Sequence, residues 1–252
     1  MASLQEIVAY LDGELRIAEI PDYSGAVNGL QLENDGTVTK VGAAVDASLP
    51  VVEEAAAAGV DLLVVHHGMF WQGTQPLTRA FYRKIKTAMD AGMAIYSAHL
   101  PLDVHPVLGN NALLLQALGL EADGTFLESK GTRIGLTASG GGISREELVE
   151  RVAAAVGGPV HLAPGGPEVI GKIGLVTGGA GSEVAICTAS GIDTLITGEG
   201  PHWSYPLAEE LGVNLLYAGH YATETFGVKA LAERLGRVFG LENTFIDRPS
   251  GL

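Results

Sequence analysis

Several histidines stand where an α/β protein would build a site. His66 and His67 come directly after the short apolar run 62–65, and His99 and His220 each follow a further apolar run. In α/β proteins, functional side chains gather at the carboxyl ends of the strands. We therefore expect these four imidazoles to lie at such an edge.

Asp103 and Glu224 follow His99 and His220 at the same interval, so a His-x-x-x-carboxylate pattern occurs twice. A single histidine is more often a hydrogen-bonded structural residue, because an isolated imidazole carries little motif content. The repeated pattern favours a metal site instead. Imidazole and carboxylate ligands together suit Zn, Fe, Mn, Co or Ni better than Ca or Cu(I).

The number of candidate ligands suits two ions. Neighbouring residues on a strand point in opposite directions, so His66 and His67 could each reach a different ion. A carboxylate such as Glu224 can bridge two cations about 3.5–4 Å apart, as in two-metal hydrolytic sites. We predict two divalent ions per chain, bound by His66, His67, His99, Asp103, His220 and Glu224.

Short apolar runs alternate with amphipathic segments, which is α/β order and predicts mostly parallel or mixed sheets with helices on both faces. Ser3 and Glu6 form a capping box that opens the first helix, and Ser144 and Glu147 open another that runs to about residue 156. In the first half the expected strands are 41–45, 62–65 and 94–97, and the expected helices are 48–58, 78–91 and 110–118.

An internal repeat relates the two halves of the chain. A shift of 132 positions lays residues 41–68 on residues 173–200 without a gap, matching their strands and glycines. A shift of 121 lays His99 on His220 and Asp103 on Glu224. We infer a duplicated α/β unit.

The duplication predicts two interlocked three-layer α/β/α units, residues 1–127 and 128–252. The Gly-rich segment 127–142 is expected to join them. The C-terminal segment with His220 and Glu224 would then return to a metal site built with the first unit.

Composition narrows the class of protein. Hydrophobic residues make up 47% of 252 residues, which disfavours disorder. The net charge of -14 disfavours generic binding to nucleic acid or to an anionic membrane. With one cysteine, Cys187, there is no internal disulfide. The sequence shows neither a signal peptide nor a membrane span, so we expect a cytoplasmic protein.

The same residues carry a resemblance to the YbgI-type, Nif-three-like family of dinuclear metal proteins. Its paired-histidine and His-Tyr-x-x-Glu motifs are specific, and the similarity covers nearly the whole chain. The resembling segments are 28–33 (NGLQLE), 64–71 (VVHHGMFW), 99–111 (HLPLDVHPVLGNN), 197–199 (TGE), 219–224 (GHYATE) and 244–247 (TFID).

The resemblance implies a dinuclear centre, a duplicated α/β fold and a toroidal homohexamer. The family is often described as a type of GTP cyclohydrolase homologue, which implies attack on the purine imidazole carbon followed by ring opening. Many relatives carry a long domain inserted between the halves, and this chain is too short for one.

Other residues have weaker claims. Glu199, the repeat counterpart of His67, and His202 are tentative catalytic residues that could touch substrate or support a ligand. A turn carboxylate and an ordinary surface histidine are the alternatives. The Gly-rich segment 177–182 could bind a phosphate, but it lacks the third glycine of the dinucleotide fingerprint, so a tight turn is favoured.

Further side chains near the ligands have two interpretations. His105 could lie near the site or be an ordinary histidine, and His161 has no partner pattern. Phe70, Trp71 and Tyr221 could stack on a planar base, although core packing is the better expectation for each.

Two functions fit this pattern. The first is a metal-dependent hydrolase, cyclohydrolase-like or phosphoesterase-like, in which activated water attacks carbon or phosphorus of a nucleotide-like small molecule. The second is a non-catalytic metal-binding or interaction scaffold. Six protein ligands for two ions leave open coordination positions, which favours the enzyme.

Overall fold

The computed structural model describes residues 2–252 and divides the chain into two compact units. The first unit comprises Met1–Leu102 and Gly227–Arg248, and the second comprises Asp103–Phe226 and Pro249–Leu252. Within residues 2–252, no helix combines the length and apolarity that crossing a bilayer requires. The expected boundary after residue 127 differs from this division, because residues 103–126 fold with the second unit.

The first unit is built on a mixed five-stranded sheet that is parallel except for one edge. The edge strand β2 runs antiparallel to its neighbour, whereas the other strands pair in parallel. A short antiparallel pair, β1 (Ala2–Ser3) and β3 (Thr37–Val38), lies outside this sheet. The strand order is β13 (Glu242–Phe245), β4 (Lys40–Asp46), β5 (Leu62–His67), β6 (Ala94–Ser97) and β2 (Gly29–Leu32).

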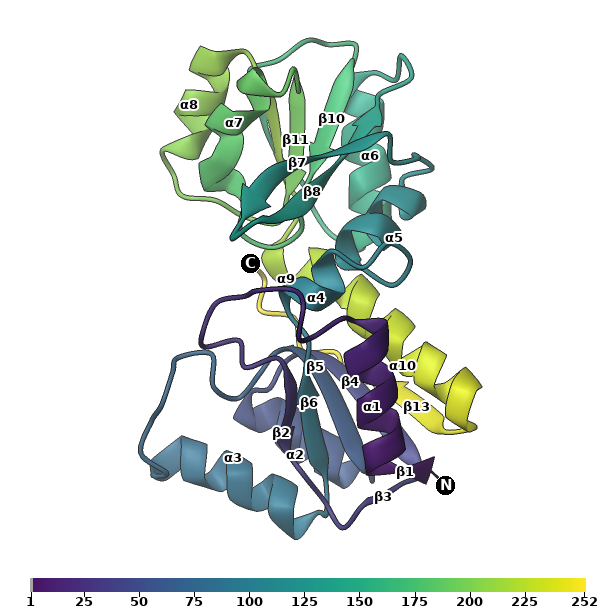
Figure 1. The fold of residues 1–252 in the computed structure, drawn as a ribbon. Helices are drawn as coiled ribbons and strands as arrows, with labels where there is room; N and C mark the ends of the chain where they lie inside the picture. Colours follow the sequence, from purple (N-terminus) through teal and green to yellow (C-terminus); the bar gives the residue numbers. More distant parts are fainter. Residues whose placement is uncertain (1) are drawn as a thin grey trace. The chain divides into compact units, whose positions relative to one another are not determined.

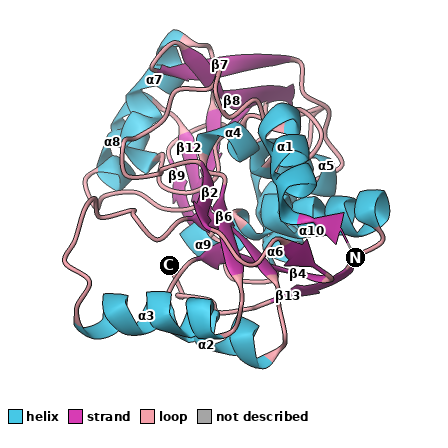
Figure 2. Ribbon diagram, turned by 60° about the horizontal axis from the view of Figure 1, so that its bottom comes forward, coloured by secondary structure: helices cyan, strands magenta, loops and turns pink. Residues whose placement is uncertain are grey.

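Helices cover both faces of this sheet. Helices α2 (Leu49–Ala57) and α3 (Arg79–Asp90) run side by side and pack on one face through a buried apolar cluster (Figure 2). Helices α1 (Leu4–Glu14) and α10 (Thr225–Phe239) lie together on the other face (Figure 1). Because both faces are covered, the central strands are apolar throughout instead of alternating.

The second unit has a mixed six-stranded sheet, again covered on both faces (Figure 1). Helices α5 (Asn110–Ala117) and α6 (Arg145–Val156) pack on one face, and α7 (Val184–Ala189) and α8 (Ser204–Leu211) on the other. The strand order is β7 (Gly124–Ser129), β8 (Thr132–Ser139), β10 (Lys172–Leu175), β11 (Thr194–Thr197), β12 (Asn214–Tyr217) and β9 (His161–Pro164).

The predicted repeat is confirmed in the register of the strands. Val41 pairs with Leu62 between β4 and β5, and Ile173 pairs with Thr194 between β10 and β11, which is the same register after a shift of 132. In each unit the third parallel strand, β6 or β12, then carries an antiparallel edge strand. The units differ on the opposite side, where β13 is parallel to β4 but β8 is antiparallel to β10.

Two polar contacts are also duplicated. The Asp61 carboxylate accepts hydrogen bonds from the backbone amides at positions 39 and 40, and Asp193 accepts from those at 171 and 172. The Lys40 ammonium donates to the carbonyl of Ala58, and Lys172 donates to that of Ser190. These contacts hold the start of β4 against the turn before β5, and in the second unit they hold the start of β10 against the turn before β11.

Two expectations about individual segments need correction. His66 and His67 do not follow a strand but are its last two residues, because Asp46 of β4 still pairs with His67. The Gly-rich segment 127–142 is not a linker, because most of it forms the β7–β8 hairpin of the second unit. Its glycines serve that hairpin: Gly131 takes a positive φ of 84° in the turn, and Gly135 lies against the Phe126 ring.

Candidate metal-binding site

Three histidines converge at the carboxyl edge of the sheet in the first unit. His66 and His67 end β5, and His99 follows β6, the neighbouring parallel strand. One ring nitrogen from each of the three lies within 4.8 Å of the others. His66 is fully buried and the other two are partly buried, so the group is well placed to hold a cation away from bulk water.

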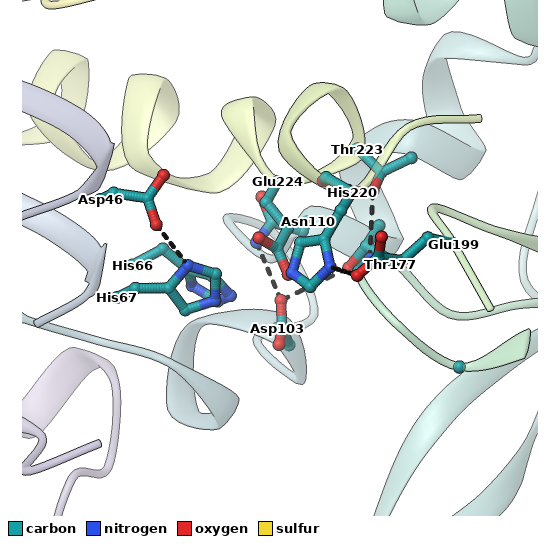
Figure 3. A network of polar contacts seen from close by, with 12 residues as sticks. Asp46, His66, His67, Asp103, Asn110, Thr177, Glu199, His220, Thr223 and Glu224 are labelled. Atoms are coloured by element: carbon teal, nitrogen blue, oxygen red, sulfur yellow. Dashed lines mark hydrogen bonds and ion pairs between the residues drawn. The ribbon is translucent and has the colours of Figure 1, made fainter. Parts of the chain in front are cut away.

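The rings of His66 and His67 are each held by an oxygen acceptor. Nδ1 of His66 donates to the carbonyl of Ala98 over 2.9 Å, and Nδ1 of His67 donates to the Asp46 carboxylate, also over 2.9 Å (Figure 3). Because carbonyl and carboxylate oxygens only accept, Nδ1 carries the proton in both rings. Nε2 is then the ring nitrogen that carries the lone pair, and it is the atom through which either ring could bind a metal.

His99 is fixed in the same way by Asp22. Its Nδ1 lies 2.9 Å from one carboxylate oxygen and 3.0 Å from the other. Burial acts to raise the pKa of Asp22, but the hydrogen bond and charge of His99, with help from Asn28, lower it overall. Asn28 also accepts from the backbone amide of His99, so it ties the loop of Asp22 to the end of β6.

The turn after the paired histidines is shaped by Gln31 and Gly68. Gln31 of β2 accepts from the amide of Met69 and donates to the carbonyls of Ala26 and Val27, which precede this strand. A Cβ at Gly68 would lie 2.2 Å from the Gln31 amide, so only glycine allows this approach. The segment 28–33 therefore holds both the turn after His66 and His67 and the end of β6 before His99.

His220 and Glu224 form the corresponding group in the second unit. Helix α9 (His220–Thr223) begins directly after β12, and Nε2 of His220 lies 3.2 Å from Oε1 of Glu224. Nδ1 of His220 donates to Glu199 over 2.8 Å. Burial lowers the pKa of His220, but Glu224 and Glu199 outweigh this effect and raise the pKa to about 9. The two carboxylates around His220 thus favour positive charge at this position, which is what a set of metal ligands must do.

Glu224 and Asp103 are buried carboxylates, with 3% and 9% of their surface exposed. Carboxylates are seldom buried unless they are paired or bind a metal. Oδ1 of Asp103 accepts from the Asn110 amide over 2.8 Å, and Thr177 lies 3.5 Å from the same oxygen. Figure 3 shows Asp103 between these two partners and His220 between Glu224 and Glu199.

The Gly-rich segment after β10 supports this group and does not form a phosphate loop. The amides of Thr177, Gly178 and Ala180 donate to side chains of the same unit, and that of Gly181 donates to the Glu199 carbonyl. Gly178 has a positive φ of 70°, and a Cβ there would lie 2.4 Å from Oε1 of Glu224. The favoured interpretation as a tight turn agrees with these contacts.

The structure places three of the weaker candidates, His202, His105 and Phe70, as follows. His202 is exposed, and among residues 2–252 its side chain has no hydrogen bond or ion pair to either group. Nδ1 of His105 accepts from the amides of Val107 and Leu108, so it caps a turn. Phe70 packs on the core cluster beside α3, as expected for core packing.

Asp22 and Asp46 are functional candidates that the sequence pattern did not reveal. Asp46 ends β4, the strand beside the one with the paired histidines, so its position at a carboxyl edge was a usable signal. Asp22 lies in a loop with no periodic pattern. Only its contacts with Asn28 and His99 identify it.

The donor chemistry of both groups fits a divalent metal. Each group combines imidazole nitrogens, and in the second unit buried carboxylates, with acceptors that hold Nδ1. This arrangement of an oxygen acceptor behind a ligating histidine is the usual one in metal sites. Neither group contains a thiolate, since Cys187 is buried in the core cluster of α7, where burial raises the pKa of its thiol to about 12.

Comparisons with known proteins cover the whole fold. The family model described as Duf34/NIF3 (NGG1p interacting factor 3) matches residues 2–250. A Deinococcus radiodurans protein named GTP cyclohydrolase 1 type 2 homolog is 39% identical over 98% of this chain and 94% of its own length. The crystal structure of TTHA1606 from Thermus thermophilus matches 99% of this chain and 100% of its own, with a TM-score of 0.88 and 38% identity. The structure of protein ybgI, of unknown function, also matches 99% of this chain and 100% of its own, with a TM-score of 0.89 and 34% identity.

The contact between Glu199 and His220 predicts a loss of metal affinity in Glu199→Gln. Removing the charge behind Nδ1 makes the imidazole a weaker ligand and loosens its orientation, which typically costs about 10- to 100-fold in affinity. Competition with a coloured chelator measures this. The control His202→Ala is expected to bind metal normally, and an unchanged affinity in Glu199→Gln would contradict the assignment.

Gly178→Ala is expected to lower metal binding by displacing Glu224. Gly191→Ala is the matched control, because Gly191 has a similar φ of 66° but open space around its Cα. Both variants should lose about 1–2 kcal/mol of unfolding free energy from the left-handed backbone. Only Gly178→Ala should also lose metal, measured by elemental analysis of folded protein. Equal metal contents would refute the role of Gly178.

Proposed function

The chain belongs to the Duf34/NIF3 family, and from that premise we propose that it is a metal-dependent hydrolase whose centre binds two divalent ions. The proposed ligands are the six predicted ones. Divalent ions in such a centre activate water and stabilise developing negative charge, which is the chemistry that hydrolysis requires.

The observation that carries the proposal is the common arrangement of four imidazoles. Each has Nδ1 bound to an oxygen acceptor of its own unit, at 2.8 to 2.9 Å. In all four rings Nε2 is therefore the nitrogen that remains as the candidate ligand atom. In metal sites the arrangement fixes the tautomer and makes the imidazole a better ligand.

The proposal includes a single centre formed by the histidines of the first unit and the ligands of the second. Chain connectivity supports this. Only residues 100–102 separate His99 from Asp103, so their Cα atoms are within about 14 Å of each other. Glu224 likewise precedes Gly227, where the chain re-enters the first unit, by three positions. Of the three passages between the units, the first two thus have a proposed ligand beside them, and the third, between Arg248 and Pro249, has none.

The proposed substrate is a nucleotide-like small molecule. Support comes from relatives named GTP cyclohydrolase 1 type 2 homolog, which are 38–39% identical to this chain over nearly all of its length. Cyclic amides and phosphoesters suit the same ligands, so the substrate panel must include both. We further propose a cytoplasmic toroidal homohexamer, to be tested by fractionation of cells and by sedimentation equilibrium.

Turnover is expected to depend on metal. The purified chain is assayed against nucleotides, cyclic amides and phosphoesters after chelation and again after reloading with Zn, Mn or Fe. We expect chelation to abolish hydrolysis of at least one substrate and reloading to restore it. Fully loaded protein that hydrolyses nothing, with ligand substitutions affecting only stability or assembly, would instead support a metal-binding scaffold.

A further inference from the structure

A pocket of about 270 Å³ lies in the first unit, beside the end of β5. This volume is near the lower end for small-molecule sites, which run from roughly 300 to 1,000 Å³. The residues that line it come from the segment after the paired histidines, from α3 and, at Leu49, from α2. Those that matter here are Gly68, Trp71, Gln72, Gln75, Phe81 and Lys84.

Lys84 is the charged residue of this pocket. Its ammonium donates to the carbonyl of Ala47 over 2.7 Å and lies 5.5 Å from the centre of the Phe81 ring. Burial lowers the pKa of Lys84. Although acidic residues outnumber basic ones by 29 to 15, none of those that the structure describes forms an ion pair with this ammonium. A half-buried cation whose partners are a neutral carbonyl and an aromatic ring would be further stabilised by an anion.

Short contacts connect the pocket to the histidines. The amide of Ala47 donates to the carbonyl of His67 over 2.8 Å, so the acceptor of Lys84 is bonded to the strand that carries the paired histidines. The Trp71 ring lies 4.6 Å from the His67 ring and 4.7 Å from that of His99. Trp71 therefore lines the pocket and also contacts two candidate metal ligands.

We propose that this pocket binds an oxyanion, phosphate or carboxylate, carried by the molecule on which the neighbouring metal centre acts. Lys84 pairs with the anion. Gln72 and Gln75 line the same pocket, where the Gln75 amide donates to Gln72 over 3.2 Å, and their remaining amide hydrogens supply further donors. In a chain with a net charge of -14, a local cation selects an anionic group and orients it. The proposal that an anion binds here depends only on this pocket. The proposal that the anion is part of the substrate also rests on the proposed function.

Fluorescence of Trp71 tests anion binding directly. The chain has two tryptophans, so Trp203→Phe leaves Trp71 as the only indole. Metal-free, desalted protein is titrated with inorganic phosphate and with acetate, so that no metal can bind either anion. We expect a saturable change for at least one anion, weakened about tenfold or more by Lys84→Gln and largely retained by Lys84→Arg.

The matched control is Lys86→Gln. Lys86 is exposed on the same helix and pairs with Asp90, so its removal should leave anion affinity unchanged. No saturable change, or equal affinities in the Lys84→Gln and parent proteins, would overturn the proposal. A lower melting temperature in Lys84→Gln with unchanged anion affinity would show that Lys84 only tethers Ala47.

Turnover separates this proposal from the proposed function. For an anionic substrate, Lys84→Gln should raise KM about tenfold with little change in kcat, whereas an uncharged analogue should show no such rise. An unchanged KM despite lost phosphate binding would overturn the substrate assignment and leave a site for a free anion. If nothing in the panel is hydrolysed, the proposed function fails, and the fluorescence titration still decides whether the pocket binds anions.

Discussion

The hydrogen bond from each imidazole Nδ1 to an oxygen acceptor is the constraint on which the rest of the structure depends. It fixes the proton on Nδ1 and leaves Nε2 as the ligand atom. Ala98, Asp46, Asp22 and Glu199 provide the acceptors. Backbone and side-chain contacts place these acceptors: Asn28 holds the loop of Asp22, and the tight turn at Gly178 and Gly181 bonds to the backbone of Glu199.

Duplication explains how one chain supplies two such groups. The same register between the first two parallel strands, and the same aspartate and lysine contacts, place a carboxyl edge in each unit. The two edges differ in their residues. The first unit has paired histidines, whereas the second has Glu199 at the position that corresponds to His67, and Glu199 accepts from a histidine that follows the next strand. Of the six proposed ligands, those of the first unit are therefore all imidazoles, and two of the three in the second unit are carboxylates.

Much of this could be predicted from the sequence, because glycines and apolar runs at fixed spacing define strands, turns and the repeat. The supporting acids could not, since Asp22 acts through a loop and Asp46 through a neighbouring strand. Glycine content also misled the interpretation of residues 127–142. There, glycine permits a tight turn and the approach of Phe126, so the segment is a hairpin. The sequence shows no break in pattern where the chain passes back to the first unit, because α10 continues across that point.

The central claim is that both groups bind metal as one dinuclear centre. Elemental analysis of protein purified without chelator and reloaded with Zn, Mn or Fe tests it most directly. The account predicts about two equivalents per chain, with Glu224→Gln weakening both ions and His66→Ala mainly one. A metal content that remains near zero after reloading with all three metals would contradict it.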